Sequence, residues 1–383
     1  MRHTVWNNRV LWVWVVLVYG LSCVAAWSQW AGDTLFCPKQ EFTLPKQELT
    51  LLFVGDLMQH QAQIDAARTT SGYDYSDCFL RVKDEIEKAD LAIGNLEVTL
   101  AGKPYRGYPQ FSAPDTYLEA IREAGFDVLL TANNHCLDRR KKGLERTVLL
   151  LDSLEIPHAG TYVNKEERAQ HYPLLIEKNG FRIVLLNYTY GTNGIPVDTP
   201  NVVNYIDRAV IEEDIAKARA MHPDVLIACM HWGIEYKSLP EKADKQLATW
   251  LLEKGVDHVI GSHPHVVQPM EVVCDSVGEK HLVVYSLGNY LSNMSKRATD
   301  GGLMVRLTLE KTDHKVRLTD CAYSLVWVSR PVLSGKKNFQ LYPAGISPDS
   351  LNVLEKSKLN LFLKDSRTLF NTHNKGISEY IFK

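Results

Sequence analysis

The feature of the sequence that most constrains its fold is a regular alternation between short apolar runs and longer amphipathic stretches. The apolar runs have the length of buried strands and cover residues 50–54, 91–93, 128–131, 183–188, 225–230, 258–260, 282–285 and 303–309. Stretches with helical spacing of apolar residues lie at 78–88, 116–124, 143–154, 208–221 and 242–254. Because nearly all-apolar strands need cover on both faces, this order predicts an α/β fold with helices packed on sheet faces.

The last part of the sequence has a different pattern. Between 271 and 324, strand-like runs are joined by hairpin-type turns, which predicts antiparallel strands at the end of the sheet system. Residues 29–48 show no apolar period, so we interpret them as a linker and expect the fold to begin near Leu49. We therefore predict one domain over 49–330 and a C-terminal extension over 331–383 with a helix-like pattern.

The composition excludes several classes of protein. Hydrophobic residues make up 45% of the 383 residues and charged residues 23%, as in a folded globular chain and unlike a disordered or multi-span membrane protein. The chain has 43 Lys and Arg against 45 Asp and Glu, so its formal net charge is −2. Since this charge leaves no excess of cations to neutralise a phosphate backbone, we expect no nucleic acid partner.

Residues 1–28 have the layout of a secretory signal peptide, because two arginines precede an uncharged apolar run over 10–26 and small residues follow. A second interpretation is an N-terminal membrane anchor, since about 17 apolar residues are the lower limit for a bilayer-spanning helix. A third is lipid modification of Cys23. All three predict an exported protein whose body is periplasmic or otherwise extracytoplasmic, and they differ in whether it is membrane-anchored.

Polar residues fall directly after six of the apolar runs. They lie in Gly55-Asp56, Asn95-Leu96-Glu97, Asn133-Asn134-His135, His231-Trp232-Gly233, His263-Pro264-His265 and Leu287-Gly288-Asn289. In open α/β sheets, ligands bind in the crevice beyond the carboxyl ends of the strands. We therefore expect these endings to converge on one site. The aromatic residues Trp232, Tyr236, Tyr188 and Tyr190 are candidates for the lining of its groove, although aromatic residues at such positions more often belong to the core.

The polar residues at these endings are of types that bind a divalent cation. The donors are the carboxylates of Asp56 and Glu97, the amide oxygen of Asn134, and the imidazoles of His231, His263 and His265. A mixed nitrogen and oxygen set of this kind suits zinc, manganese or iron, and magnesium prefers fewer imidazoles. The proline in His263-Pro264-His265 fixes one backbone angle, so the loop presents two imidazoles at a small entropic cost.

Each of these residues also has a plainer interpretation when it is taken singly. Asp56 after a glycine fits a turn or a helix cap, and His231 in a strand fits a hydrogen-bonded core histidine. The His-Pro-His segment fits a surface loop. Only the complete ordered set favours a metal site over these alternatives.

The same ordered set resembles the CapA family, the poly-γ-glutamate or capsule biosynthesis group, whose sequences are distantly related to metallophosphoesterases. The matching motifs run from about Leu49 to Leu309 and include Asp138 and Gly143 after Asn134-His135. This resemblance implies a four-layer α/β/β/α sandwich of the metallophosphoesterase type, with two stacked sheets, helices outside and a metal site at one edge.

The resemblance also implies a role for each matching residue. The implied metal ligands are Asp56, Glu97, Asn134, His231, His263 and His265. His135 corresponds to the histidine that acts on the leaving group, which makes it the implied catalytic residue. One position departs from the pattern, because metallophosphoesterases usually carry Asp-x-His in the first motif and Met58 stands here at the third position. The number of metal ions, one or an unequal pair, therefore stays open.

Two functions are compatible with this resemblance. The first is a metal-dependent hydrolase of the cell envelope that acts in capsule or poly-γ-glutamate synthesis or export. Its partner would be an anionic polymer or a phosphorylated envelope substrate. The second is a non-catalytic factor that binds or assembles the polymer through the same metal-organised cleft, with membrane association through the N-terminal segment. Because a fold and a family do not fix an activity, both hypotheses are kept at this point.

Overall fold

The computed structural model describes residues 46–312 and 315–383. The signal peptide or anchor, Cys23 and nearly all of the expected linker lie outside the described residues. No helix within the described ranges is both long and apolar enough to cross a membrane.

Two large sheets organise the structure. The first has nine strands, and its main path runs in the order β16-β15-β14-β1-β2-β3-β4, with β13 beside β1 and β17 beside β15. The strands are β1 (Gln47–Leu57), β2 (Leu91–Leu96), β3 (Val128–Leu130), β4 (His158–Ala159), β13 (Asn289–Leu291), β14 (Gly301–Thr312), β15 (Lys315–Ser329), β16 (Gln340–Pro343) and β17 (Ser378–Glu379). Strands β1 to β4 pair in parallel, and β14 to β16 add antiparallel strands.

The second sheet has six strands in the order β11-β12-β10-β9-β7-β6. They are β6 (Leu174–Lys178), β7 (Phe181–Thr189), β9 (Val225–His231), β10 (His258–Ser262), β11 (Met270–Cys274) and β12 (Lys280–Val284). Its four central strands are parallel, and both edge strands are antiparallel. A small antiparallel pair, β5 (Thr161–Tyr162) and β8 (Val202–Val203), stands apart.

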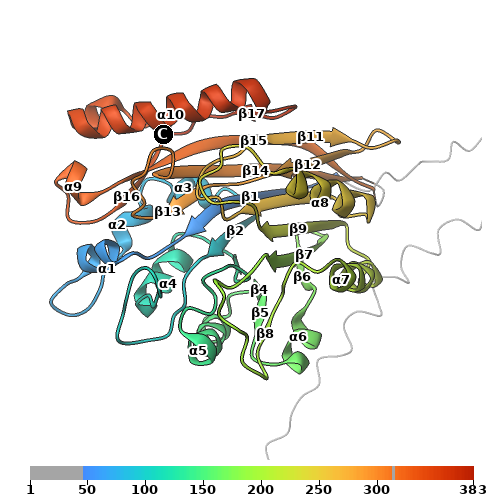
Figure 1. Cartoon of the computed structure of the whole chain (residues 1–383). Helices are drawn as coiled ribbons and strands as arrows, with labels where there is room; N and C mark the ends of the chain where they lie inside the picture. Colours follow the sequence, from blue (N-terminus) through green and yellow to red (C-terminus); the bar gives the residue numbers. More distant parts are fainter. Residues whose placement is uncertain (1–45, 313–314) are drawn as a thin grey trace, which may run out of the picture. The chain divides into compact units, whose positions relative to one another are not determined.

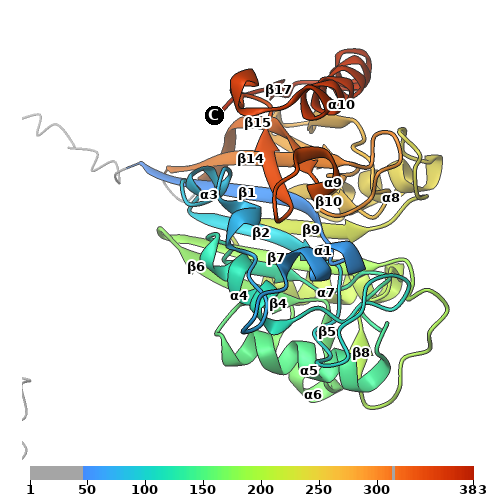
Figure 2. The same cartoon turned by 90° about the vertical axis from the view of Figure 1, so that its left-hand side faces the viewer.

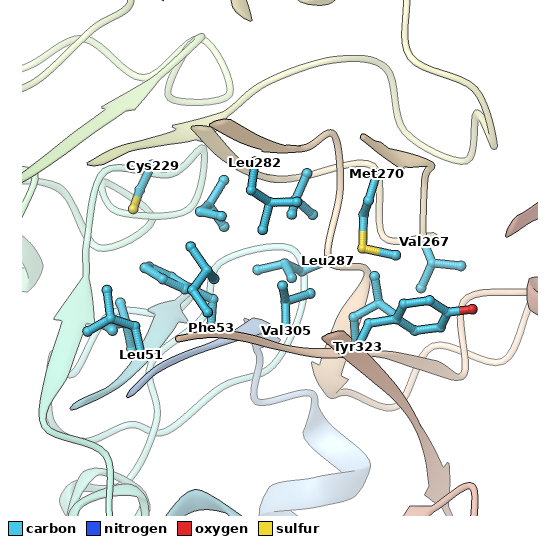
Figure 3. Packing of buried hydrophobic residues seen from close by; sticks show 14 of the residues in the cluster. Leu51, Phe53, Cys229, Val267, Met270, Leu282, Leu287, Val305 and Tyr323 are labelled. Atoms are coloured by element: carbon cyan, nitrogen blue, oxygen red, sulfur yellow. The ribbon is translucent and has the colours of Figure 1, made fainter. Parts of the chain in front are cut away.

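Alternation of side chains along the strands explains why the two sheets stack. In β1, Leu51 and Phe53 point toward the second sheet, whereas Leu52 and Val54 point to the opposite face. In β9, Cys229 points back toward the first sheet. Figure 3 shows these inward-facing side chains meeting between the sheets. Because the side-chain period of a strand is two, each all-apolar strand contributes to two separate layers of core.

Helices cover the outer face of each sheet (Figure 1). Against the first sheet pack side chains of α1 (Gln61–Ala67), α2 (Ser76–Phe79), α3 (Lys83–Ile86), α4 (Asp115–Glu123) and α5 (Arg140–Ser153). Against the second sheet pack those of α7 (Arg208–Ala220) and α8 (Lys242–Glu253). The remaining helices are α6 (Lys165–His171), α9 (Pro331–Ser334), η1 (Pro348–Ser350) and α10 (Val353–His373). This arrangement confirms the expected α/β fold with four α/β/β/α layers.

The predicted elements match the observed ones closely, with one correction. The eight predicted strands correspond to observed strands that differ from them by a few residues at the ends. Strand β1 begins at Gln47, three residues before the predicted strand and two before Leu49, so the last residues of the expected linker belong to it. The stretch 78–88, however, is wrong as one continuous helix, because the four-residue helix α2 ends at Phe79 and a second four-residue helix, α3, covers only Lys83–Ile86. Such short turns are not stable alone, so packing of their buried side chains against the sheet holds them.

The long helix α10 belongs to the same core as the two sheets. Figures 1 and 2 show it lying over β15. Its buried face includes Phe362 and Phe370, and the Phe370 ring lies 4.9 Å from that of Tyr323 in β15. The backbone N–H of Val272 in the edge strand β11 donates to the carbonyl of Lys375, just beyond the helix, at 2.8 Å. The helix therefore covers inner-face residues of β15 beside the edge of the second sheet.

We predict that this packing makes α10 part of the cooperative folding unit. Phe362→Ala is expected to lower the free energy of unfolding by about 3–5 kcal/mol, because it leaves a cavity in a fully packed region. Val353→Ala, at an exposed position of the same helix, is the matched control and is expected to stay within about 0.5 kcal/mol. Urea unfolding measures both. Equal stabilities for the two variants would show that the helix does not contribute to the core.

Candidate metal centre

Strand ends of the first sheet bring four of the predicted residues to one edge. Asp56 lies at the end of β1, and Glu97 directly follows β2, which runs parallel to β1. Asn134 and His135 lie in the connection between β3 and α5. A close approach of two chains positions Asp56, because its N–H donates to the carbonyl of Gly288 at 2.9 Å. A Cβ on the preceding Gly55 would lie 2.0 Å from that carbonyl oxygen, so only glycine fits there.

The second sheet presents the three histidines to the same edge. His231 is the last residue of β9, and His263 and His265 follow β10, which runs parallel to β9. The Nδ1 atom of His265 lies 3.2 Å from Asp56 Oδ2, and its Nε2 atom lies 3.8 Å from Glu97 Oε1. The Nε2 atom of His231 lies 3.9 Å from the same Glu97 oxygen. One ligand atom each from Asp56, Glu97 and His265 lie within 4.8 Å of one another.

The other predicted donors adjoin this cluster. The amide oxygen of Asn134 lies 2.8 Å from Nε2 of His231. The ring of His263 lies 4.8 Å from that of His231 and 6.0 Å from that of His265, measured between centroids. The structure therefore gathers all six predicted donors, together with His135, at the edge where the two sheets meet.

Several buried polar atoms of this cluster have no hydrogen-bond partner. Both carboxylate oxygens of Glu97 lack a hydrogen-bond partner although the residue is fully buried. The same is true of Asp56 Oδ2 and His263 Nδ1. The contact between Asp56 Oδ2 and His265 Nδ1 is close but is not aligned as a hydrogen bond. Buried charges that lack partners are costly unless a counter-ion compensates them. Oxygen and nitrogen donors left open in this way fit a bound divalent cation.

The pKa values of these groups follow from burial and from their neighbours. Burial, and then the negative charge of Asp56, raises the pKa of Glu97 well above its usual range. Burial lowers the pKa of His231 well below its usual value and that of His263 to about 3, with further lowering by the neighbouring histidines. Burial also disfavours protonation of His265, but contact with Asp56 outweighs this and raises its pKa. His231 and His263 are therefore neutral at physiological pH, the form in which imidazole binds metals.

Two asparagines that sequence reasoning did not assign as site residues hold the donors in place. The Nδ2 of Asn95 donates to Asp56 Oδ1 at 2.7 Å and lies 3.4 Å from Nδ1 of His231. Asn289 Oδ1 lies 3.0 Å from Nδ1 of His265, and its Nδ2 donates to the carbonyl of Thr299. Both directly follow a glycine in the sequence, at Gly94-Asn95 and Gly288-Asn289, which was the available signal. Side chains that hydrogen-bond to metal ligands and hold them in position are a regular part of metal sites.

His135 has a carboxylate partner of its own. Its Nδ1 lies 2.8 Å from Asp138 Oδ2, which also accepts the backbone N–H of Phe111 at 2.8 Å. The Phe111 ring packs at 4.7 Å from the imidazole ring of His135. The contact with Asp138 therefore engages Nδ1 of His135, and together with the packing of Phe111 it fixes the orientation of the imidazole ring.

The backbone is strained at the two histidines that follow β10, His263 and His265. His263 has φ +103° and His265 has φ +58°, and Tyr236 beside them has φ +67°. Left-handed conformations are costly for residues with large side chains and persist where surrounding structure imposes them, often at functional sites.

The four aromatic residues considered for the groove divide into two classes. Trp232 and Tyr188 are buried in the core between the second sheet and its helices, as the plainer interpretation holds. Tyr190 and Tyr236 are 47% and 40% exposed and lie against the histidines. Burial, and then the charge of Glu235, raises the pKa of Tyr190 and raises that of Tyr236 to about 12. Glu235 is therefore an acidic group close to both rings that the sequence analysis did not identify.

Comparison with solved structures gives distant likenesses. The chain is similar to a novel phosphatase from Mycoplasma pneumoniae, with a TM-score of 0.45 and 14% identity over 75% of this chain and 96% of that one. It is also similar to the calcineurin-like phosphoesterase YfkN from Bacillus subtilis, with a TM-score of 0.44 and 16% identity over 73% of this chain and 91% of that one.

Comparison with characterised sequences gives closer relatives. The chain is 26% identical to the capsule biosynthesis protein CapA of Bacillus anthracis over 79% of this chain and 73% of that protein. It is 27% identical to the PGA biosynthesis protein CapA of Bacillus subtilis strain 168 over 80% of this chain and 78% of that protein. The model of the bacterial capsule synthesis protein family PGA_cap matches residues 50–294, which include all six donors and His135. These matches confirm the resemblance found in the sequence, and the chain belongs to the bacterial capsule synthesis protein family PGA_cap.

Proposed function

We propose that this protein is a divalent-metal-dependent hydrolase that cleaves phosphoester bonds of an anionic or phosphorylated substrate in capsule synthesis or export. The observation that carries this proposal is the buried pair Asp56 and Glu97, whose unpartnered oxygens lie within 4 Å of imidazole nitrogens of His231 and His265. Such a pair is stable only with a proton or a cation between the carboxylates. The names of the relatives, which refer to capsule and PGA biosynthesis, support the biological process.

The six gathered donors would hold the metal ion. They are Asp56, Glu97, Asn134, His231, His263 and His265. This mixed set suits manganese, zinc or iron. When bound, such an ion lowers the pKa of a coordinated water and polarises a phosphoryl oxygen. Asn95 and Asn289 orient two of the donors, and the nearly complete burial of the cluster excludes bulk water.

His135 supplies the proton in the proposed reaction. Hydrolysis forms a bond between a water oxygen and phosphorus, with release of one water proton to solvent, and breaks the bond between phosphorus and the ester oxygen, which then needs a proton. Because Asp138 engages Nδ1 of His135, Nε2 is the nitrogen left to carry that proton. Asp138 also fixes the orientation of the ring, and positioned acid catalysis of this kind contributes roughly 10²–10⁴ in rate.

The position of Met58 favours a second candidate function. Its side chain is buried and offers no oxygen or nitrogen donor where metallophosphoesterases usually carry histidine. A centre with one ion instead of a pair is therefore favoured, and two-ion clamping of attacking and leaving oxygens would not operate. In this alternative, the same donors hold an anionic polymer without turnover, and the protein acts in assembly.

We also propose that the protein acts outside the cytoplasm. The support is the layout of residues 1–28, with arginines before an apolar run and small residues after it. Whether this segment is cleaved or retained as a membrane anchor decides the membrane association of the protein.

Our first prediction from this proposal concerns metal and stability. Mn²⁺ at about 100 times its dissociation constant is expected to add about 2.7 kcal/mol to the free energy of unfolding of the wild type, because it binds only the folded state. Asp56→Asn is expected to abolish this gain, since it removes a ligand charge. Without metal, the same variant is expected to be no less stable than the wild type, because it relieves repulsion of Glu97.

Thermal unfolding with added Mn²⁺ and with a chelator measures these differences, and elemental analysis gives the bound metal. The control is His171→Ala at an exposed position at the end of α6, which is expected to keep the full metal response. A wild type whose unfolding temperature is the same in chelator and in Mn²⁺ would refute the metal centre.

A further prediction separates turnover from polymer holding. His135→Ala is expected to keep its metal and to lose activity toward an alkyl phosphodiester by about 10²–10⁴-fold, because an alkoxide must be protonated as it leaves. Activity toward a p-nitrophenyl ester is expected to fall much less, since that leaving group departs without a proton. Steady-state kinetics with both esters provide the measurement. If the metal-loaded wild type binds polymer but cleaves neither ester, the assembly role replaces the hydrolase.

A further inference from the structure

Three exposed tyrosines surround the histidines of the metal centre. Tyr190 lies 4.5 Å from the ring of His263, Tyr236 lies 6.3 Å from His265, and Tyr108 lies 6.4 Å from His135, all between ring centroids. Tyr108 is 71% exposed, more than the other two. Most exposed aromatic side chains have no special function, but each of these three contacts a different histidine of one buried site. We define Tyr108, Tyr190 and Tyr236 as the tyrosine rim.

The backbone holds two members of the rim in fixed positions. The N–H of Tyr190 donates to the carbonyl of His231 at 3.0 Å, and the N–H of Tyr236 donates to the carbonyl of Pro264 at 2.8 Å. The backbones of both residues are thus tied directly to the strand end and the loop that carry the histidines. Tyr236 additionally keeps its left-handed backbone, which costs energy for a bulky residue. A rigid aromatic side chain binds a ligand at a small entropic cost, so the rim is preorganised for binding.

The charges beside the rim indicate what kind of ligand fits. Lys296 Nζ lies 4.1 Å from the centroid of the Tyr236 ring. Glu235 places a negative charge close enough to act on Tyr190, Tyr236 and His265. The neutral phenols have one charge of each sign beside them, Lys296 and Glu235, so the rim offers no excess of positive charge to a polymer that is anionic on every residue. They suit a ligand that is uncharged where it meets the rings and anionic only where it enters the centre.

We propose that the tyrosine rim binds the flat C–H face of a pyranose ring, and that the substrate of the proposed hydrolase is a glycosyl phosphate. The negative face of an aromatic ring attracts the partly positive C–H groups of the sugar. The phenol hydroxyls donate hydrogen bonds to the sugar oxygens. This inference rests on the proposed function, because the phosphate group of the same ligand occupies the metal centre.

Calorimetric titration of the full chain loaded with Mn²⁺ tests the inference. The probes are inorganic phosphate, a glucosyl methylenephosphonate that resists hydrolysis, and a short γ-linked glutamate oligomer. The glucosyl probe is expected to bind about tenfold more tightly than inorganic phosphate, as one to two aromatic contacts provide. Tyr190→Ala and Tyr236→Ala are expected to lose this advantage while their affinity for inorganic phosphate is unchanged.

Two further variants serve as controls. Tyr190→Phe keeps the ring and is expected to retain most of the advantage. Trp250→Ala, at a partly exposed aromatic on α8 that contacts Arg208 and Lys254, is expected to behave as the wild type. Three results would each overturn the rim proposal alone. They are equal affinities of the wild type for the glucosyl probe and for phosphate, a glucosyl advantage that both alanine variants retain, and tighter binding of the glutamate oligomer than of the glucosyl probe. Absence of phosphate binding to the metal-loaded wild type would refute the rim proposal and the proposed function together.

Discussion

The repulsion between two buried carboxylates, Asp56 and Glu97, is the constraint on which the site depends. Neither residue is exposed, and three of their four oxygens accept no hydrogen bond. In a low-dielectric interior, such a pair destabilises the folded chain unless a proton or a cation lies between them. A folded protein that keeps both residues therefore needs a compensating charge. A metal ion could also be bound by the neutral imidazoles of His231 and His263, which lie beside the pair, whereas a proton would leave them without a partner.

The stacked sheets make it possible to build such a site. Donors from β1 and β2 meet donors from β9 and β10 only because both sheets end at the same edge. The apolar layer between the sheets fixes their separation, and close-packed cores resist even small displacements. Each donor is therefore held within a short distance of a rigid strand. Because the strands do not shift, charged side chains at their ends keep their positions although they are buried close together.

Much of this architecture was predictable from the sequence. The rest could not be predicted, and the reasons can be identified. The strands and the six donors were predictable because apolar runs mark buried strands and polar residues after them mark strand ends. The break between α2 and α3 was not, since the buried residues keep a helical spacing across it. Tyr188 and Tyr190 look alike in sequence, yet only Tyr190 lies beyond the end of β7. The contact of α10 with β15 depends on tertiary packing, which local periodicity does not encode.

The contrast between a buried centre and an exposed rim suggests how specificity divides between them. The histidines and acids of the centre are at most about 4% exposed, so in our proposal a substrate meets them with a small group such as a phosphate. Small anionic groups are common to many substrates, and the centre alone therefore discriminates little between them. The tyrosines meet whatever is attached to that group, and differences in binding at their faces decide which substrate is held. In a family that carries the same donors, substrate choice would then change through residues at the positions of Tyr108, Tyr190 and Tyr236 without any change of ligands.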